Sequence, residues 1–274
     1  MAWYELNLAT LGLQKNCNMH LLVGYHNELW KHSRIQLKQF LVTNEQLCLL
    51  RFCHNAEQLN TIFNLLNHCD KNFNSTRYVC SLNKMYKYAQ DLRDDYLLQL
   101  LAHKHDIEVW QTVADTLATG SHFERLKTYF RTNVSSYALA KQTGKKLLVK
   151  ISPEQLSSFV DFLFYKIQKQ IPEYSRVEGI GQIRKDIADY IFMVQWLEDF
   201  QPLNHHRTHI TGLKKVMVLM DIKHENEKKM LIMSRININS KLQKEIVKQQ
   251  LVETQLNNEI SDTLKTWIEM SNKN

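Results

Sequence analysis

The sequence predicts an all-α protein: an irregular multi-helix bundle that ends in a long amphipathic helix. The 274-residue chain contains only 7 Gly and 3 Pro, and neither residue occurs between Tyr25 and Thr119 or between Leu213 and Asn274. A β-rich chain of this length would need many turns, and turns recruit Gly and Pro. Apolar residues also recur at helical spacing along most of the chain. We therefore expect helices joined by short Asn, Asp, Ser and Thr turns.

Polar residues mark the expected helix starts in the first half of the chain. Asn55 and Asp106 each precede an apolar face at helical spacing, so each is a candidate N-cap. Ser121 and Glu124 have capping-box spacing, in which each side chain satisfies a free backbone N–H of the other residue. The apolar faces behind the first two caps are Leu59, Ile62, Phe63 and Leu66, and Ile107, Trp110, Val113 and Leu117.

The clearest helix start is the sequence Ser152-Pro153-Glu154-Gln155. It places a cap, a proline at the first helical position and a capping-box glutamine in order. Pro172 ends this helix, and another is expected after Gly181. The apolar faces are Leu156, Phe159, Val160, Leu163, Ile167 and Ile171 in the first, and Ile183, Ile187, Ile191, Val194 and Leu197 in the second.

The segment from Lys241 to Met270 is polar except for one thin apolar stripe. This pattern is typical of a long amphipathic helix that packs on a partner or on the body of its own protein. Gln249 and Glu253 interrupt the repeat, so a docked helix is favoured over a coiled coil. The stripe, which we predict to bind a partner protein, consists of Leu242, Ile246, Leu256, Ile260, Leu264 and Ile268.

Two segments leave the choice between helix and strand open. Two apolar runs flank a polar stretch within residues 216–233, where either a short β-hairpin or one continuous helix would fit. The absence of Gly and Pro favours the helix. Residues 145–151 would likewise fit a short strand. A glycine and a lysine cluster near residues 141–152 suggest helical blocks at 1–140 and 152–274, with a single domain as the alternative.

Composition points to an ordinary globular protein. Hydrophobic residues make up 44% of the chain and charged residues 23%, and no apolar run approaches the roughly 18–20 residues that a membrane span needs. The five cysteines are an odd number, and no secretory signal is recognisable. We therefore expect a cytoplasmic protein with reduced thiols, no membrane span and no cofactor. The net charge of +7 is spread along the chain, which permits an acidic partner without requiring one.

Two groups of histidines and cysteines invite a metal-site interpretation. Cys17 and His20 have metal-ligand spacing, and further cysteines and histidines follow at 48, 53, 54, 68 and 69. No paired C-x-x-C knuckle is present, so buried thiols without a metal are the favoured interpretation. His205, His206 and His209 lack the glutamate of an H-E-x-x-H motif. They are interpreted either as a solvated basic helix start or as a polyanion contact.

The loop Glu178-Gly179-Ile180-Gly181 is a candidate phosphate-binding turn. Over residues 176–188 it resembles the Gly-h-Gly turn of helix-hairpin-helix DNA-binding motifs, which implies that backbone N–H groups at the following helix start would hold a phosphate. It departs from that family at Lys185, where a small residue is usual. A plain loop between helices, in which glycine supplies a positive φ, is the favoured interpretation.

A nucleic-acid-associated accessory protein is the first alternative function. Tyr78, Tyr86, Tyr88 and Tyr96 stand among basic residues, and such aromatics either stack on bases or fill a core. Several basic residues and the glycine loop would contact phosphates. The candidate nucleic-acid-binding residues are Lys145, Lys146, Lys150, Gly179, Gly181, Arg184, Arg207, Lys214 and Lys215.

A Mg²⁺-dependent helical enzyme is the second alternative. Asp91, Asp94 and Asp95 share one helix face, and Asp186 and Asp189 form a second carboxylate pair. Hard cations require converging oxygen ligands, and these spacings also arise in ordinary surface salt bridges. No catalytic arrangement stands out. The leading hypothesis is therefore a non-enzymatic helical binding or assembly subunit of an intracellular complex, with unknown oligomeric state.

Overall fold

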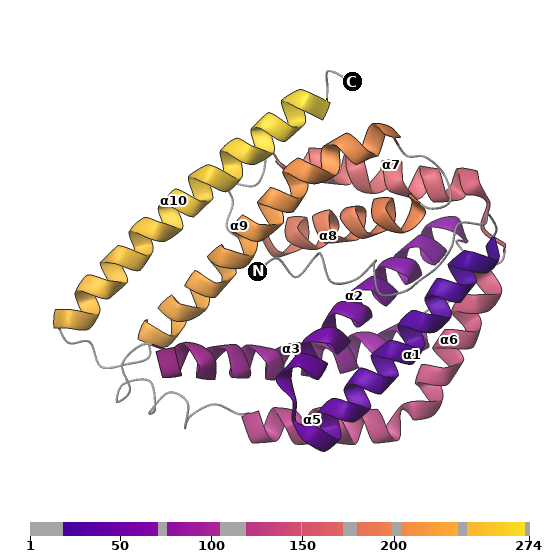
Figure 1. Ribbon diagram of the computed structural model, residues 1–274, viewed down its shortest axis with the longest axis horizontal. Helices are drawn as coiled ribbons and strands as arrows, with labels where there is room; N and C mark the ends of the chain where they lie inside the picture. Colours follow the sequence, from indigo (N-terminus) through magenta and orange to yellow (C-terminus); the bar gives the residue numbers. More distant parts are fainter. Residues whose placement is uncertain are drawn as a thin grey trace. The chain divides into compact units, whose positions relative to one another are not determined.

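The protein is all-α, as the sequence predicts. The computed structural model describes the chain from residue 19 to residue 271, with gaps, and every regular element in that part is a helix (Figure 1). No helix among these residues is both long and apolar enough to cross a bilayer. The described residues are 19–70, 76–104, 119–148, 150–171, 180–198, 204–234 and 240–271.

Helices account for nearly all of the described residues. The longest is α10, and α9 is almost as long. The helices are α1 (Met19–Thr43), α2 (Gln46–Cys69), α3 (Thr76–Lys104), α5 (Thr119–Thr132), α6 (Val134–Leu148), α7 (Pro153–Gln170), α8 (Ile180–Leu197), α9 (Asn204–Ser234) and α10 (Ser240–Ser271).

The chain divides into two compact units. Residues 22–159 and 226–250 form one, here named the α1–α6 unit. The described residues within 160–225 and 251–271 form the other, here named the α7–α10 unit. The divisions fall inside α7, α9 and α10, whereas the sequence suggested a division near residues 141–152, between helices.

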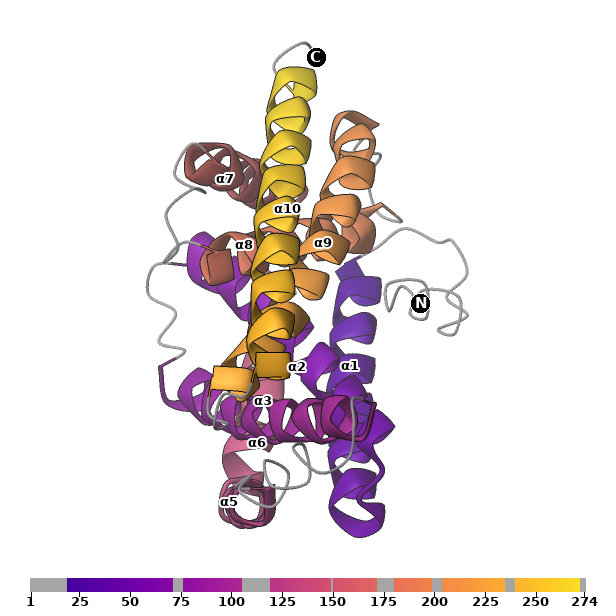
Figure 2. The same cartoon turned by 90° about the vertical axis from the view of Figure 1, so that its left-hand side faces the viewer.

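In the α1–α6 unit, α3 lies against α2, α5 and α6 (Figure 2). Aromatic side chains of α1 tie that helix to its neighbours: Trp30 meets Phe63 of α2 edge-on at a centroid distance of 6.3 Å. Phe40 meets Tyr96 of α3 at 6.3 Å and Phe123 of α5 at 5.7 Å. Edge-to-face geometry brings the positive ring edge to the negative ring face, which adds to the stabilisation from burial.

Asn55 does not cap a helix, contrary to the prediction. It lies inside α2, which begins at Gln46. The preceding helix, α1, ends at Thr43, and the next residue, Asn44, has a φ of 56°, the left-handed conformation that commonly terminates helices. The N–H of Asn44 donates to the carbonyl oxygen of Phe40 at 2.8 Å, as in a helix C-terminal motif. The turn between α1 and α2 at Asn44 therefore lies eleven positions before Asn55, the predicted cap.

The start of α7 confirms the predicted capping box. The Ser152 N–H donates to Gln155 Oε1 at 2.8 Å, and the Gln155 N–H donates back to Ser152 Oγ at 3.3 Å. Pro153 is the first helical residue, where its missing N–H costs nothing. The reciprocal pair satisfies two otherwise free backbone donors. Every predicted apolar residue of this helix is buried: Leu156, Phe159, Val160, Leu163, Ile167 and Ile171.

Residues 216–233 form no hairpin; they belong to α9, which is continuous. Val216 and Met217 are fully buried while Val218 is 40% exposed, an order that a helix surface produces and a β alternation does not. The polar stretch contributes Asn226, which donates to the carbonyl oxygen of Gln249 at 3.1 Å within the α1–α6 unit. A polar stretch between apolar runs is in this case part of a helix and not a turn.

Two other local predictions also differ from the structure. Residues 145–148 continue α6, so the short strand considered there is absent. The described part of α5 begins at Thr119, two positions before Ser121. Ser121 therefore lies within the helix and is not the cap of the capping box predicted for Ser121 and Glu124. The start of the helix predicted after Asp106 lies outside the described residues.

The α7–α10 unit is built around Phe164 of α7. Its ring contacts aromatic or imidazole rings from α8, α9 and α10, with centroid distances between 5.3 and 5.9 Å. Because four helices contribute to one cluster, their relative positions within this unit are fixed by side-chain packing. The surrounding rings are those of Tyr190, His206, His209 and Trp267.

Candidate functional site

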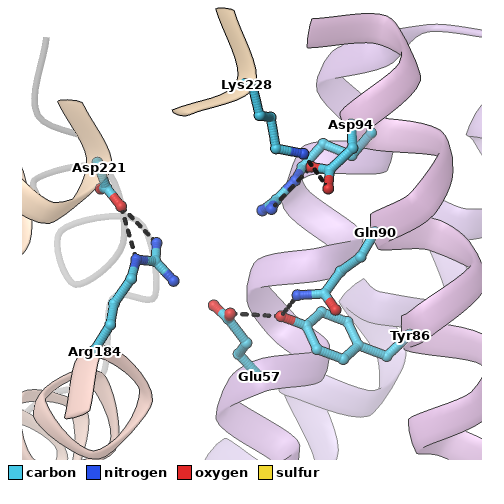
Figure 3. Close-up of polar contacts among 8 residues, drawn as sticks. Glu57, Tyr86, Gln90, Asp94, Arg184, Asp221 and Lys228 are labelled. Carbon is cyan, nitrogen blue, oxygen red and sulfur yellow. Dashed lines mark hydrogen bonds and ion pairs between the residues drawn. The ribbon is translucent and has the colours of Figure 1, made fainter. Parts of the chain in front are cut away.

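Two of the three candidate Mg²⁺ ligands of α3, Asp94 and Asp95, are engaged with basic side chains of the protein. Asp94 forms an ion pair with Lys228, shown in Figure 3. Asp95 accepts a hydrogen bond from His122 Nδ1 at 2.7 Å. Asp91 is half-buried on the same helix. These contacts are those of a protein ion-pair network within the α1–α6 unit.

Asp186 of α8 is a buried carboxylate with a complete set of donors. It is 2% exposed, and it accepts hydrogen bonds from Lys166 Nζ at 2.8 Å, Gln170 Nε2 at 2.8 Å and Gln182 Nε2 at 2.9 Å. A buried charge needs such partners to offset the loss of hydration. Asp186 therefore joins α7 to α8. Its predicted partner Asp189 is also buried, at 5% exposure.

Metal-ligating side chains do not gather in the part of the chain that the structure describes. No group of three or more His, Cys, Asp or Glu there could hold a metal ion. Cys48 and Cys53 are buried free thiols, and burial raises the pKa of Cys53 to about 12. A thiol with so high a pKa is a poor nucleophile at neutral pH. Cys17 and the side chain of His20 lie outside the described residues.

Three of the candidate phosphate-binding cations have acidic partners in the protein. Arg184 donates from Nε and Nη2 to one oxygen of Asp221, at 2.9 and 2.6 Å (Figure 3). Such pairs reduce the positive potential that would attract a polyanion. The other two pairs, also within the described residues, join Arg207 to Glu198 at 2.8 Å and Lys215 to Glu259 at 3.5 Å.

Lys145, Lys146 and Lys150 form a second set of candidate cations, and all three are exposed. No ion pair joins any of them to another described residue. Lys145 and Lys146 occupy the last turn of α6, where lysines stabilise a helix by facing its free carbonyl groups. Those carbonyl groups repel a phosphate, so this helix end is a weaker anion site than a helix start would be.

The glycine loop is only partly described. Gly181 is the second residue of α8 and is exposed, which agrees with a phosphate-accessible helix start. Gly179 lies outside the described residues, and Lys214 is half-buried on α9. The resemblance to a helix-hairpin-helix turn therefore stays a prediction.

His206 and His209 are buried, whereas the sequence suggested a solvated basic helix start or a polyanion contact. They are 6% and 2% exposed. His206 Nε2 lies 3.1 Å from Asp161 Oδ1 of α7, and His206 Nδ1 lies 2.9 Å from the Tyr190 hydroxyl of α8. Burial raises the pKa of Tyr190, so its hydroxyl stays protonated. The imidazole of His206 thus links three helices. The side chain of His205 lies outside the described residues.

Three of the four tyrosines that suggested base stacking, Tyr86, Tyr88 and Tyr96, make contacts within the protein, and the side chain of Tyr78 lies outside the described residues. The Tyr86 hydroxyl donates to Glu57 Oε1 of α2 and accepts a hydrogen bond from Gln90 (Figure 3). Tyr88 meets Tyr129 of α5 edge-on at 5.5 Å. These contacts favour the alternative interpretation of the aromatics as core and rim residues. The sequence gives no signal for the pairing of Glu57 with Tyr86, because the two residues come from different helices.

The predicted partner-binding stripe of α10 is buried over its C-terminal part within the α7–α10 unit. Ile260 and Leu264 are fully buried and Leu256 is 8% exposed. Nearby Trp267 Nε1 donates to the carbonyl oxygen of His209 at 2.9 Å. These stripe residues contact the body of their own unit. Ile246 and Ile268 are half-buried, and the side chain of Leu242 lies outside the described residues.

The outer face of α7 carries exposed aromatic side chains that the sequence analysis did not single out. Phe162 is 46% exposed and Tyr165 is 67% exposed, and Lys169 follows on the same face. The three residues lie on the helix opposite its buried apolar face. The sequence does contain a signal for this face, because two aromatic residues occupy positions where an amphipathic helix normally has polar residues. We name Phe162, Tyr165 and Lys169 the α7 outer face.

Comparison of this chain with known protein families, with curated protein sequences and with solved structures found no match to any of them. The geometry of the side chains is therefore the basis on which a function can be proposed.

Proposed function

We propose that this protein is a non-enzymatic helical binding module that docks a partner protein on the α7 outer face. The observation that carries the proposal is the exposure of two large aromatic side chains, Phe162 and Tyr165, less than one helical turn apart. Tyr and Phe are enriched in the buried centres of protein interfaces. Their rigid rings lose little conformational entropy on binding and bring a large apolar area.

The surroundings of the two rings resemble an interface rim. Lys169 is exposed beyond Tyr165, and the side chains of Asp161 and Lys166 are 50% and 36% exposed. Polar groups around an aromatic centre exclude water from it and set the orientation of a partner. Burying apolar surface contributes roughly 25 cal/mol per Å². A partner that covers both rings therefore gains more than one that touches a single exposed side chain.

Partner binding through α10 remains a prediction. Its residues Leu256, Ile260 and Leu264 are already buried in the α7–α10 unit, so a partner could reach them only if that unit opened. Exposing this core would cost several kcal/mol, because each fully buried leucine or isoleucine contributes roughly 1.5–3 kcal/mol by burial alone. The α7 outer face needs no such opening, which is why we assign the docking surface to α7.

Site-specific photo-crosslinking in living cells tests this proposal. A photoreactive phenylalanine analogue replaces Tyr165 in the full chain, and a second strain carries it at Lys185, an exposed position on α8. We expect a discrete protein adduct from position 165 that disappears when Phe162→Ser is added, and none from position 185. Equal adducts from both positions, or none from either, would refute a docking surface on α7.

Nucleic-acid binding is a second proposal, carried by the exposed Lys145, Lys146 and Lys150 without ion-pair partners among the described residues. Fluorescence anisotropy with labelled single- and double-stranded DNA and RNA across a salt series tests it. Phosphate contacts would give an affinity that falls steeply with salt and weakens in a Lys145→Glu/Lys146→Glu variant. Arg184→Gln, which removes a paired cation, is the control. No binding at low salt would exclude this function.

A further inference from the structure

We infer that α1 carries a second docking surface, whose occupant is an acidic amphipathic helix of another protein. This surface belongs to the α1–α6 unit and does not involve α7, so it is additional to the proposed function. It is a narrow strip of residues along the outer side of α1, which we name the α1 outer stripe. The stripe consists of Lys31, Ile35, Lys38 and Val42, with Arg34 beside it.

The α1 outer stripe lies opposite the buried face of its helix. Its members follow one another at intervals of four, three and four, so they fall on one side of α1. Leu29, Leu37 and Phe40 are buried on the other side and hold α1 in its unit, at whose outside the helix lies (Figure 1). The helix thus presents a packed apolar face inward and a mixed basic and apolar strip outward.

Two of the stripe residues are aliphatic side chains exposed to solvent. Val42 is 85% exposed, more than any other large apolar side chain among the described residues, and Ile35 is 41% exposed. Core positions of paired helices recur at the same intervals of three and four, and β-branched residues are common at one of them. A second helix laid along α1 would therefore cover both side chains at once.

The other members of the stripe are cations. From Lys31 to Thr43 the sequence of α1 contains basic residues and no acidic one. Arg34 and Lys38 are exposed, and neither forms an ion pair with another described residue. Lys31 has an intrahelical pair with Glu28 at 3.3 Å, in which both side chains are exposed and the attraction is therefore weak. The positive charge of the stripe is thus available to an acidic partner.

The mixture of cations and aliphatic residues favours a protein helix over two other negatively charged partners. A nucleic acid would contact the cations through its phosphates and leave Ile35 and Val42 uncovered. An anionic membrane would need a broad apolar face that enters the lipid, whereas the bulky apolar residues of α1 are buried in its own unit. A helix with acidic and apolar residues at matching intervals satisfies both kinds of stripe residue.

The length of the stripe indicates a weak and reversible contact. The helix from Lys31 to Val42 extends about 16 Å, which is about three turns. An interface of this length lies well below the ~800 Å² per partner of a standard stable complex. Because exposed charges contribute to it, binding should weaken as the salt concentration rises.

Fluorescence anisotropy with the purified full chain and a labelled synthetic peptide tests this inference. The peptide has about 20 residues, enough to be helical by itself, with Glu and Leu alternating at intervals of four and three along one side. A control peptide has Gln in place of every Glu. We expect the acidic peptide to bind with a micromolar dissociation constant at low salt, and the Gln peptide to bind about tenfold more weakly.

Two variants separate the charged contribution from the apolar one. Lys38→Glu turns an attraction into a repulsion and should weaken binding about tenfold. Ile35→Ser removes apolar contact area and should weaken it about threefold to fivefold. The matched controls are Lys87→Glu at an exposed position of α3 and Leu139→Ser in α6, where Leu139 is 44% exposed. Both controls should bind the peptide as the natural chain does, and all four variants should keep the natural circular dichroism.

A zero-length carbodiimide crosslink locates the peptide on the chain. The reagent joins a Glu carboxylate to a lysine amine as an amide, with loss of water, only when the two groups are in contact. Mass spectrometry should find the peptide attached to Lys31 or Lys38. Adducts mainly at Lys145 or Lys146, the exposed lysines of α6, would place the peptide on a different surface and overturn the inference.

The binding data contain three further results that would overturn it. One is the absence of binding by the acidic peptide at low salt, and another is equal binding by the natural chain, Lys38→Glu and Ile35→Ser. The third is a loss in Lys38→Glu without a loss in Ile35→Ser, because a surface that attracts negative charge alone fits a phosphate backbone or an anionic lipid. A labelled oligonucleotide and vesicles containing phosphatidylserine would then identify which. The crosslink at Tyr165 in cells is independent of all these results, so the α7 proposal stands or fails separately.

Discussion

The hydroxyl of Tyr96 on α3 donates a hydrogen bond to Oδ1 of Asn44, a residue 52 positions earlier, in the turn between α1 and α2. Asn44 has a φ of 56°, which is strained for most residues other than glycine and tolerated by asparagine. The contact therefore joins the turn that orients α2 against α1 to the helix that both of them pack on. It couples local backbone geometry to packing within the α1–α6 unit.

Three substitutions separate the hydrogen bond from the backbone strain. Tyr96→Phe removes the donor and should lower the free energy of unfolding by about 1 kcal/mol. Asn44→Gly keeps the left-handed φ and should cost a similar amount. Asn44→Ala loses the bond and adds backbone strain, so we expect about 2 kcal/mol. Urea denaturation measures all three. Equal stability of the Gly and Ala variants would show that φ at this position is not under strain.

Gly144 of α6 should not tolerate a side chain, because it closely approaches His26 of α1. A Cβ at Gly144 would lie 2.6 Å from His26 Nε2. That ring is fully buried and accepts a hydrogen bond from Trp30 Nε1 at 2.7 Å, so it cannot swing aside. We expect Gly144→Ala to destabilise the protein by about 1–3 kcal/mol, as overpacked cores do.

The matched control is Gly24→Ala in α1, where a Cβ would meet nothing within 4 Å. Alanine there should stabilise the protein by about 0.5–1 kcal/mol, because it reduces the conformational freedom of the unfolded chain. Thermal or urea unfolding of both variants should give opposite signs. A stabilising effect of Gly144→Ala would contradict the close approach of α1 and α6.

His26 should make the protein sensitive to acid. Burial, with a smaller contribution from the charge of Lys141, lowers the pKa of His26 from 6.5 to about 3. Because Nε2 accepts the hydrogen bond from Trp30, protonation of the ring would also break that bond. Below pH 6.5 the unfolded chain therefore binds a proton that the folded chain does not. As the pH is lowered below 6.5, the free energy of unfolding should decrease by up to about 1.4 kcal/mol per pH unit. The decrease should continue until about pH 3.

Urea denaturation at a series of pH values, from about pH 7.5 down to about pH 4, checks the prediction, because this range begins above the ordinary pKa of histidine and extends well below it. His26→Gln lacks the titrating group and should show a shallower dependence of stability on pH, whatever its stability at neutral pH. His54 shifts in the same direction, since burial lowers its pKa too, so the slope should shrink without vanishing. An unchanged slope in His26→Gln would show that this residue is not the acid-sensitive group.

Sequence patterns predicted those parts of the fold that depend on neighbouring residues. The box of Ser152 and Gln155 is local, and both of its hydrogen bonds are present. The start of α2 follows instead from the turn at Asn44, which is held by its distant partner Tyr96, and the N-cap position of α2 is Glu45, so the cap predicted at Asn55 was wrong. Short apolar runs were ambiguous for a similar reason, because packing within a unit decides whether they form a helix or a strand.

The candidate sites were harder to predict than the fold. Arg184 and Asp221 lie 37 positions apart on different helices, and nothing in the sequence shows that they pair. The burial of His206 likewise depends on Asp161 and Tyr190, which come from two other helices. Spacing of charges along the chain identifies residues that could bind a ligand. It cannot tell which of them already bind each other.

The two sides of α10 should respond very differently to the same substitution. Leu264 is fully buried, whereas Leu251 is 60% exposed. Leu264→Ala removes buried methyl groups and leaves a cavity, so we expect a loss of about 2–5 kcal/mol in the free energy of unfolding. Leu251→Ala should change it by less than about 0.5 kcal/mol. Both effects are read from urea denaturation with the same probe. If α10 instead presented its apolar stripe to a partner, Leu264→Ala would have little effect on the isolated chain, and the assignment of that stripe to the core would be wrong.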